Sequence, residues 1–233
     1  AEKENWYYDA PQMTDAQKEL GVLFQYVHHT FARLQKENKI LIADTHAVFN
    51  TGLLTPNGEE IFGLFEKNKL PYIKQEWYLE SFYIESSRYI PEKLVGSLPD
   101  CADYFSECPG DLYFDPRLKI TTNMDHILND NFERLPKMWQ AFPAKALPVL
   151  LNSASTVMIK RIIRNNRIVV PQYYKGRIMY LAPLQIGDDI APLAIEKFSD
   201  SYRINTVFSP GMAYCNARLL MKPESNWLTN TQG

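Results

Sequence analysis

The positively charged side chains of this chain are concentrated in one stretch of sequence, where they could neutralise an anionic ligand. Residues 134–187 contain no aspartate or glutamate, so this stretch carries +9, whereas the whole chain carries −2 and the rest therefore −11. Its cations are Arg134, Lys137, Lys145, Lys160, Arg161, Arg164, Arg167, Lys175 and Arg177. Such one-sided charge attracts phosphates, which are common anionic ligands of proteins. The alternative is a solvated basic face balanced by acidic residues from elsewhere in the chain.

Amide and tyrosine side chains accompany these cations. Lys160 and Arg164 are one helical turn apart and Asn165 follows them, while Gln172 and Tyr173 lie on a predicted hairpin. Cations bind phosphates, and amides and aromatic rings hydrogen-bond to bases or stack on them. Cations in the last turn of a helix also complement the helix dipole, which is a purely structural explanation. We predict a site that binds RNA or a nucleotide through Asn50, Arg117, Arg134, Lys160, Arg164, Asn165, Gln172, Tyr173, Tyr214, Asn216 and Arg218.

A second set of residues has the side chains that phosphoryl chemistry requires. Asp115, Asp125 and His126 could hold a divalent metal, Mg²⁺ or Mn²⁺, or His126 could act as a base while Lys160 stabilises negative charge. The structural alternative is that Asp125 is a helix-start charge and His126 a surface histidine. No P-loop, G-x-G-x-x-G, G-x-S-x-G or H-E-x-x-H motif occurs, so the common nucleotide-binding and hydrolase signatures are absent.

Three functions therefore stay open at this point. The first is an RNA- or nucleotide-binding module. The second is a phosphodiesterase or other nucleotide-processing enzyme with His126 and Asp115 at its active site. The third is a protein-interaction role in which the basic stretch meets an acidic partner.

The composition is that of a globular, cytoplasmic protein. The chain has 233 residues, 45% of them hydrophobic, and no apolar run long enough to span a membrane. Residues 1–8 are charged where a secretory signal would be apolar. Cys101, Cys108 and Cys215 cannot all pair with one another and form no C-x-x-C motif, which favours a reducing compartment.

Periodicity predicts an α+β fold, an antiparallel meander packed with about three to four helices in a single domain over residues 1–233. Thr14 and Gln17 form a capping box for a helix over residues 15–37, whose apolar stripe includes His28 as a packed histidine. Strands are expected over residues 40–42, 46–53, 61–65, 77–84, 118–121 and 202–208, and a hairpin over 168–181. Further helices are expected over residues 124–135, 153–164 and 212–220, the last opened by Ser209 and Pro210.

Five strings resemble a bacterial family of unknown function, also described as the OST-HTH (LOTUS)-associated domain. They are Phe49–Leu53, Tyr113–Leu118, Asp125–Arg134, Ile168–Tyr174 and Met212–Leu219. Some members are fused to the OST-HTH domain, a predicted RNA-binding module, so the resemblance implies a connection to RNA and a separate RNA-binding module as a partner. It covers residues 6–227. Gly211 stands where the family usually has an aspartate and Cys215 where it has an asparagine, so any chemistry that depends on that aspartate would be impaired here.

Overall fold

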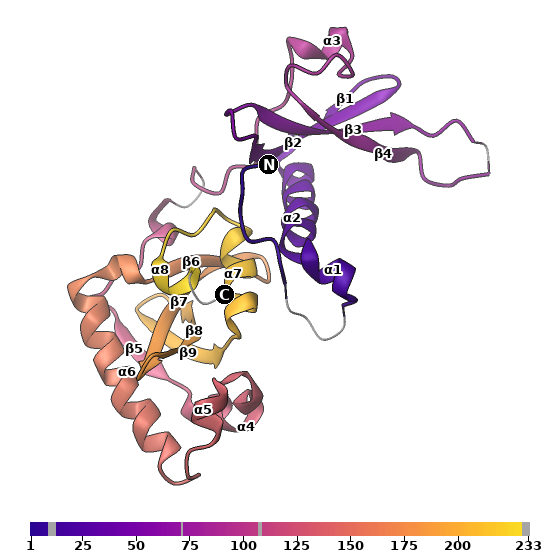
Figure 1. Ribbon diagram of the computed structural model, residues 1–233. Coiled ribbons are helices and arrows are strands. Elements are labelled where there is room, and N and C mark those ends of the chain that lie inside the picture. Colours follow the sequence, from indigo (N-terminus) through magenta and orange to yellow (C-terminus); the bar gives the residue numbers. More distant parts are fainter. Residues whose placement is uncertain (9–12, 71, 107–108, 230–233) are drawn as a thin grey trace. The chain divides into compact units, whose positions relative to one another are not determined.

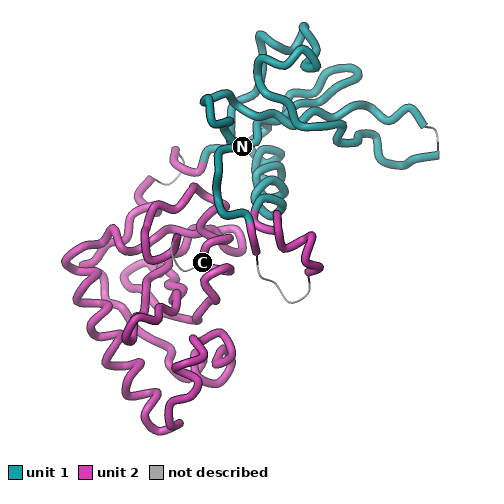
Figure 2. Tube along the Cα trace, in the orientation of Figure 1, with its two compact units in different colours: residues 1–6, 23–103 teal, residues 7–22, 104–233 magenta. Residues whose placement is uncertain are grey.

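The structure, a computed structural model, describes residues 1–8, 13–70, 72–106 and 109–229 (Figure 1). The chain forms two compact units, which Figure 2 distinguishes by colour. Unit 1 comprises residues 1–6 and 23–103, and unit 2 comprises residues 7–22 and 104–233. Each unit has its own β-sheet, and the α+β class is confirmed. That the two units form a single domain stays a prediction, and Cys108 lies outside the described residues.

Unit 1 contains the predicted antiparallel meander, with strand order β1-β2-β3-β4. Its strands are β1 (Leu41–Ile42), β2 (His46–Leu54), β3 (Glu60–Lys67) and β4 (Trp77–Ile84). The turn between β2 and β3 places Gly58 at a φ of +83°, which agrees with the Asn-Gly hairpin signal. Helix α2 (Gly21–Glu37) covers one face, where Phe31 packs against Phe49 and Phe65. The short helix α3 (Glu92–Val95) contributes Leu94 to the opposite face.

The first predicted helix is two helices, and its buried face was wrongly predicted. Helix α1 (Asp15–Glu19) has the expected capping box, but the helical hydrogen bonding is interrupted at Leu20 before α2 begins. The buried face of α2 contains Val22, Tyr26, Thr30 and Leu34, so His28 is exposed and its neighbour His29 is half-buried. Burial lowers the pKa of His29 to about 4, and the nearby Arg33 charge adds to this effect. Each residue turns a helix by about 100°, so small offsets in the predicted stripe expose the wrong side chains.

Unit 2 is built on a five-stranded sheet in the order β5-β9-β8-β7-β6. Its strands are β5 (Lys119–Thr122), β6 (Val170–Tyr174), β7 (Arg177–Ile186), β8 (Asp189–Lys197) and β9 (Ser201–Val207). All neighbours are antiparallel except β5 and β9, which are parallel. Strand β8 was not predicted, because residues 191–195 are buried on both faces and show no polar alternation.

Helices cover both faces of this sheet. On one face the long helix α6 (Leu147–Arg164) packs its Leu151, Met158 and Ile162 into a core with Tyr180 and Tyr202. Helix α6 begins six residues before the predicted start, with Pro148 in its first turn. The other face is covered by α7 (Pro210–Arg218), which contacts β6 and starts at Ser209 as expected.

The remaining helices are short. They are α4 (Met124–Asp130), α5 (Lys137–Gln140) and α8 (Asn226–Thr229), with 3₁₀ turns η1 (Pro109–Leu112), η2 (Phe132–Arg134) and η3 (Asn166–Ile168). The helix expected over residues 124–135 ends earlier because the buried Asn131 donates its amide to the His126 carbonyl at 3.1 Å. In the part of the chain that the structure describes, no helix has the length and apolar character needed to cross a membrane.

Gly63 in β3 provides a test of the unit 1 packing. A Cβ atom at this position would lie 2.0 Å from Cε1 of Phe49, whose ring is held between Phe31, Phe65 and Phe82. We expect Gly63→Ala to lower the free energy of unfolding by about 1–3 kcal/mol, because the buried ring has little room to move. Urea denaturation followed by tryptophan fluorescence measures this change. Gly96→Ala is the matched control, since its Cβ would meet nothing within 4 Å, and equal midpoints for the two variants would contradict the packing.

Candidate functional site

Four cations lie together where α6 ends and η3 begins. Lys160, Arg161 and Arg164 occupy the last five residues of α6 and Arg167 lies in η3, and all four are exposed. Among the described residues none of these four forms an ion pair, whereas Arg177 of the same basic stretch pairs with Glu196 at 2.7 Å. We call these four residues the basic end of α6.

Polar side chains fix the backbone of this basic end. The Asn165 Oδ1 accepts the Arg167 N–H at 3.2 Å and so caps η3. Asn166 donates its Nδ2 to the Phe114 carbonyl at 3.3 Å, and Trp227 donates its indole N–H to the Ile168 carbonyl at 2.8 Å. The predicted residue Asn165 therefore lies at the site and supports its shape.

The hydrogen bond from Asn166 to Phe114 brings a second segment, residues 113–117, beside η3. Arg117 donates its Nε to Asp115 Oδ1 at 2.8 Å and its Nη2 to Oδ2 at 2.7 Å. These hydrogen bonds, above all those of the side chain, lower the pKa of Asp115 to about 2. The Arg117 side chain is 86% exposed, so its guanidinium can contact a ligand beside the basic end of α6 while it stays paired with Asp115.

Tyr113 precedes Phe114 in this segment and was not among the predicted binding residues. Its side chain is exposed, whereas the next residue, Phe114, points into the core and stacks on Tyr202. The signal that could have identified it is its place at the start of the Tyr113–Leu118 string, one residue before the buried Phe114.

Four predicted binding residues instead lie on α7 and β6 inside unit 2. Gln172 is fully buried, donates its Nε2 to the Tyr180 carbonyl at 3.4 Å and accepts a hydrogen bond from Asn216 at 3.2 Å. Tyr214 is 4% exposed and Arg218 7% exposed. Asn216 is half-buried. Whether these four residues bind a ligand stays a prediction. Their clustering on α7 and β6 supports the face of the sheet opposite α6.

Tyr173 and Arg134 are half-buried. The Tyr173 ring packs near that of Tyr104, with centroids 5.8 Å apart. Arg134 donates its Nη1 to the Val207 carbonyl at 3.4 Å. Among the described residues, no hydrogen bond joins Tyr173 or Arg134 to the basic end of α6.

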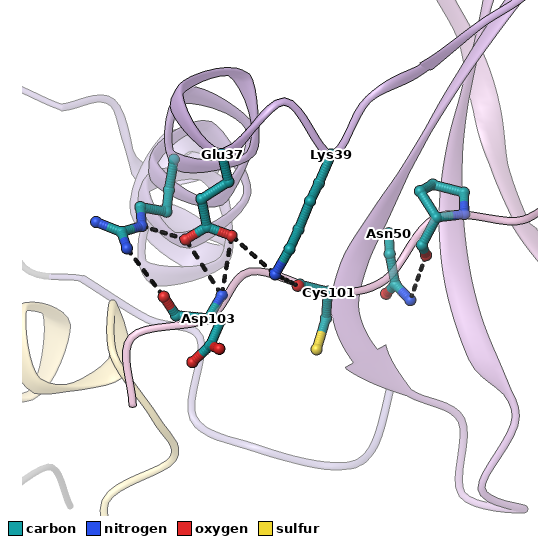
Figure 3. A network of polar contacts seen from close by, with 7 residues as sticks. Glu37, Lys39, Asn50, Cys101 and Asp103 are labelled. Atoms are coloured by element: carbon teal, nitrogen blue, oxygen red, sulfur yellow. Dashed lines mark hydrogen bonds and ion pairs between the residues drawn. The ribbon is translucent and has the colours of Figure 1, made fainter. Parts of the chain in front are cut away.

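Asn50 belongs to unit 1, where it has a structural role (Figure 3). Its Nδ2 donates to Glu60 at 3.0 Å and to the Pro99 carbonyl at 3.3 Å, while its Oδ1 accepts the Gly52 N–H at 2.9 Å. Gly52 adopts a φ of +69°, so the bulge in β2 depends on this glycine. The predicted binding residue therefore stabilises a β-bulge and the chain that follows Pro99.

The same chain segment is held further along by Glu37 at the end of α2 (Figure 3). Glu37 accepts hydrogen bonds from Arg33, from Lys39 at 3.0 Å and from the Asp103 N–H at 3.1 Å. Burial raises the pKa of Glu37, but these hydrogen bonds outweigh it and leave the pKa below its usual value. Lys39 also donates to the Cys101 carbonyl at 3.1 Å, so one carboxylate organises residues 101–103.

A strand separates Asp115 from Asp125 and His126, the other two residues considered for phosphoryl chemistry. Asp115 precedes β5 and His126 follows it, and the four residues of β5 span about 13 Å. Asp115 is engaged with Arg117, and the His126 Nδ1 lies 2.5 Å from Asp130 Oδ2, one turn further along α4. Over the described ranges no group of three or more histidine, cysteine, aspartate or glutamate side chains is placed to hold a metal ion. The exposed cations can bind an anion, and the exposed Tyr113 ring can stack on an aromatic group.

The pairing of Asp115 with Arg117 predicts an acidic titration. The carboxyl carbon of Asp115, followed by NMR, is expected to titrate with a midpoint near 2, and Arg117→Gln should move that midpoint up toward about 3.9. Because the folded-state pKa lies below the unfolded one, the pair stabilises the fold above this window, and the contribution is lost as the pH falls through it. Lys160→Gln is the control, since Lys160 forms no hydrogen bond to Asp115 in the described structure. A wild-type midpoint at the ordinary value would contradict the pairing.

Comparison with known proteins identifies a family for this chain. No curated protein and no solved structure matches the chain. A family model described as a domain of unknown function (DUF3825) matches residues 1–227, which include residues of both units. The association with OST-HTH modules stays a prediction. The chain belongs to the DUF3825 family of domains of unknown function.

Proposed function

We propose that this protein binds RNA or a nucleotide through the basic end of α6 together with Arg117. The observation that supports this proposal is the group of exposed cations Lys160, Arg161, Arg164 and Arg167, which form no ion pair among the described residues. Unpaired cations gathered on one surface repel one another, and a bound polyanion relieves that repulsion.

The helix dipole explains only part of this group. It stabilises cations in the last turn of α6, where Arg161 and Arg164 lie. Arg167 lies beyond the helix, and Arg117 comes from a segment about fifty positions earlier in the chain. The four residues of the basic end of α6 also have no acidic partner among the described residues, whereas Arg177 pairs with Glu196. A ligand with several negative charges fits all five residues. If the OST-HTH connection applies, a separate RNA-binding module would bind the same RNA.

Charge reversal provides the test of this proposal. Lys160→Glu combined with Arg164→Glu should weaken binding of a fluorescent RNA by at least tenfold and reduce the slope of log affinity against log salt concentration by about 1–2, since two phosphate contacts are lost. The melting temperature should change little, because both side chains are exposed. Fluorescence anisotropy at several salt concentrations measures both quantities.

The matched control is Lys36→Glu combined with Lys93→Glu, which changes the net charge equally through two exposed lysines of unit 1. If both double variants lose affinity to the same extent, the effect is one of total charge. Wild-type affinity that does not change over a severalfold rise in salt would exclude phosphate binding.

A phosphodiesterase is the second candidate, and one contact favours it. The short His126–Asp130 contact orients an imidazole as general bases are oriented in enzymes. If His126 is the base, His126→Ala should lower the rate of RNA or nucleotide hydrolysis by roughly two to four orders of magnitude while affinity stays within a few fold. Product formation is measured with and without Mg²⁺ or Mn²⁺, and His28→Ala, an exposed histidine of α2, is the control. Equal rates for His126→Ala and wild type would remove His126 from the mechanism.

A further inference from the structure

We propose that the ligand of this site is a single-stranded nucleic acid and that one of its unpaired bases stacks on Tyr113. This inference rests on the function proposed above and specifies its ligand. Two features carry it: the free ring of Tyr113, and the hydrogen bond that joins its segment to η3, the turn that contains Arg167.

The Tyr113 side chain is available for stacking. It is 73% exposed, and none of the described aromatic rings or cations lies against it. Two other exposed tyrosines are partly covered: Tyr89 stacks on Tyr83 with centroids 5.3 Å apart and has the Arg88 guanidinium over its ring, and Tyr174 has Lys175 over its ring.

Two tyrosines of the core, Tyr180 and Tyr202, hold the backbone that carries Tyr113 in place. The buried Tyr180 hydroxyl lies 2.6 Å from the Asp111 carbonyl and 3.2 Å from the Tyr113 carbonyl. The Asp115 N–H donates to the Tyr202 hydroxyl at 2.9 Å, so hydrogen bonds fix the segment on both sides of Phe114. A ring on such a backbone is a preorganised platform, and a base that stacks on it orders few additional groups.

The cations near Tyr113 suit the phosphates of a strand. The Asn166 side chain joins Phe114 to η3, so Tyr113 lies one residue from a carbonyl that is bound by Asn166, the neighbour of Arg167. Lys160 and Arg164 are separated by about 6 Å along the helix axis, and Arg167 and Arg117 extend the surface beyond it. One mononucleotide presents its phosphates at a single point, whereas a strand presents them in series. The spread of cations therefore favours a strand.

The free ring favours an unpaired strand over a duplex. In a duplex the base faces are stacked on one another and inaccessible to Tyr113, so only the phosphates could be bound. Single-strand-binding proteins combine a basic surface with aromatic side chains on which bases stack, and this is the combination found here.

The experiment compares a labelled 12-nucleotide RNA strand, the DNA strand of the same sequence and the RNA duplex. Wild type, Tyr113→Ala, Tyr113→Leu and Tyr113→Phe are measured by fluorescence anisotropy, with circular dichroism melting to confirm folding. Tyr72→Ala is the control, because Tyr72 is 78% exposed and lies in unit 1. The DNA arm shows whether the 2′-hydroxyl contributes to recognition.

We expect Tyr113→Ala and Tyr113→Leu to weaken single-strand binding roughly tenfold, as loss of one stacked base requires, and Tyr113→Phe and Tyr72→Ala to leave it within twofold. Duplex binding should be weaker than single-strand binding and unaffected by Tyr113→Ala. Unchanged single-strand affinity in both Tyr113→Ala and Tyr113→Leu would overturn this inference while the phosphate-binding proposal stands. The absence of salt-dependent binding to any of the three ligands by wild type would overturn both.

Discussion

Two buried tyrosines hold the segment on which the candidate site of unit 2 depends. The rings of Tyr180 and Tyr202 are part of the core between the sheet and α6, and their hydroxyls reach the backbone of residues 111–115. Burial raises the pKa of Tyr180, so its hydroxyl stays protonated and keeps its hydrogen bond to the Asp111 carbonyl. Since the stacked Phe114 fills the space beside Tyr202, the segment has one favourable position, and Asp115, Arg117 and Tyr113 are fixed with it.

Both the sequence and the fold determine where the basic charge of unit 2 lies. The chain concentrates cations within residues 134–187, and the fold then separates them. Arg134 hydrogen-bonds to a backbone carbonyl and Arg177 pairs with Glu196. The exposed cations at the end of α6 and in η3 are Lys160, Arg161, Arg164 and Arg167. These four cations form one exposed group of the basic stretch, and Lys137, Lys145 and Lys175 are exposed elsewhere in it. The charge of the four-residue group is not balanced by ion pairs within the described residues.

Unit 1 uses its polar residues in a different way. The Asn50-Thr51-Gly52 bulge and the Glu37 carboxylate both bind the backbone that follows residue 98. Thr51 donates its hydroxyl to the Ile61 carbonyl at 2.6 Å, so the bulge is anchored to β3 as well. Polar residues in a recognisable string are therefore structural here. Asn50, Gln172 and Asn216 each hydrogen-bond to another side chain of the protein.

Local signals in the sequence determined most of the elements. Runs of strand-forming residues identified β2, β3 and β4, and alternation identified β9. The Thr14 and Ser209 caps marked two helix starts, and Asn57-Gly58 marked a hairpin, because each of these signals depends on residues that are neighbours in the chain. The concentration of cations in residues 134–187 could also be predicted from the sequence, since the net charge of a stretch does not depend on folding.

Exposure was decided only by the tertiary structure. Tyr214 and Gln172 are buried because α7 packs on β6, a contact between segments some forty positions apart. Tyr113 belongs to the candidate surface because Asn166 reaches the Phe114 carbonyl across 52 positions of sequence. Long-range hydrogen bonds and packing select which of several similar side chains meets solvent, and no local pattern encodes that choice.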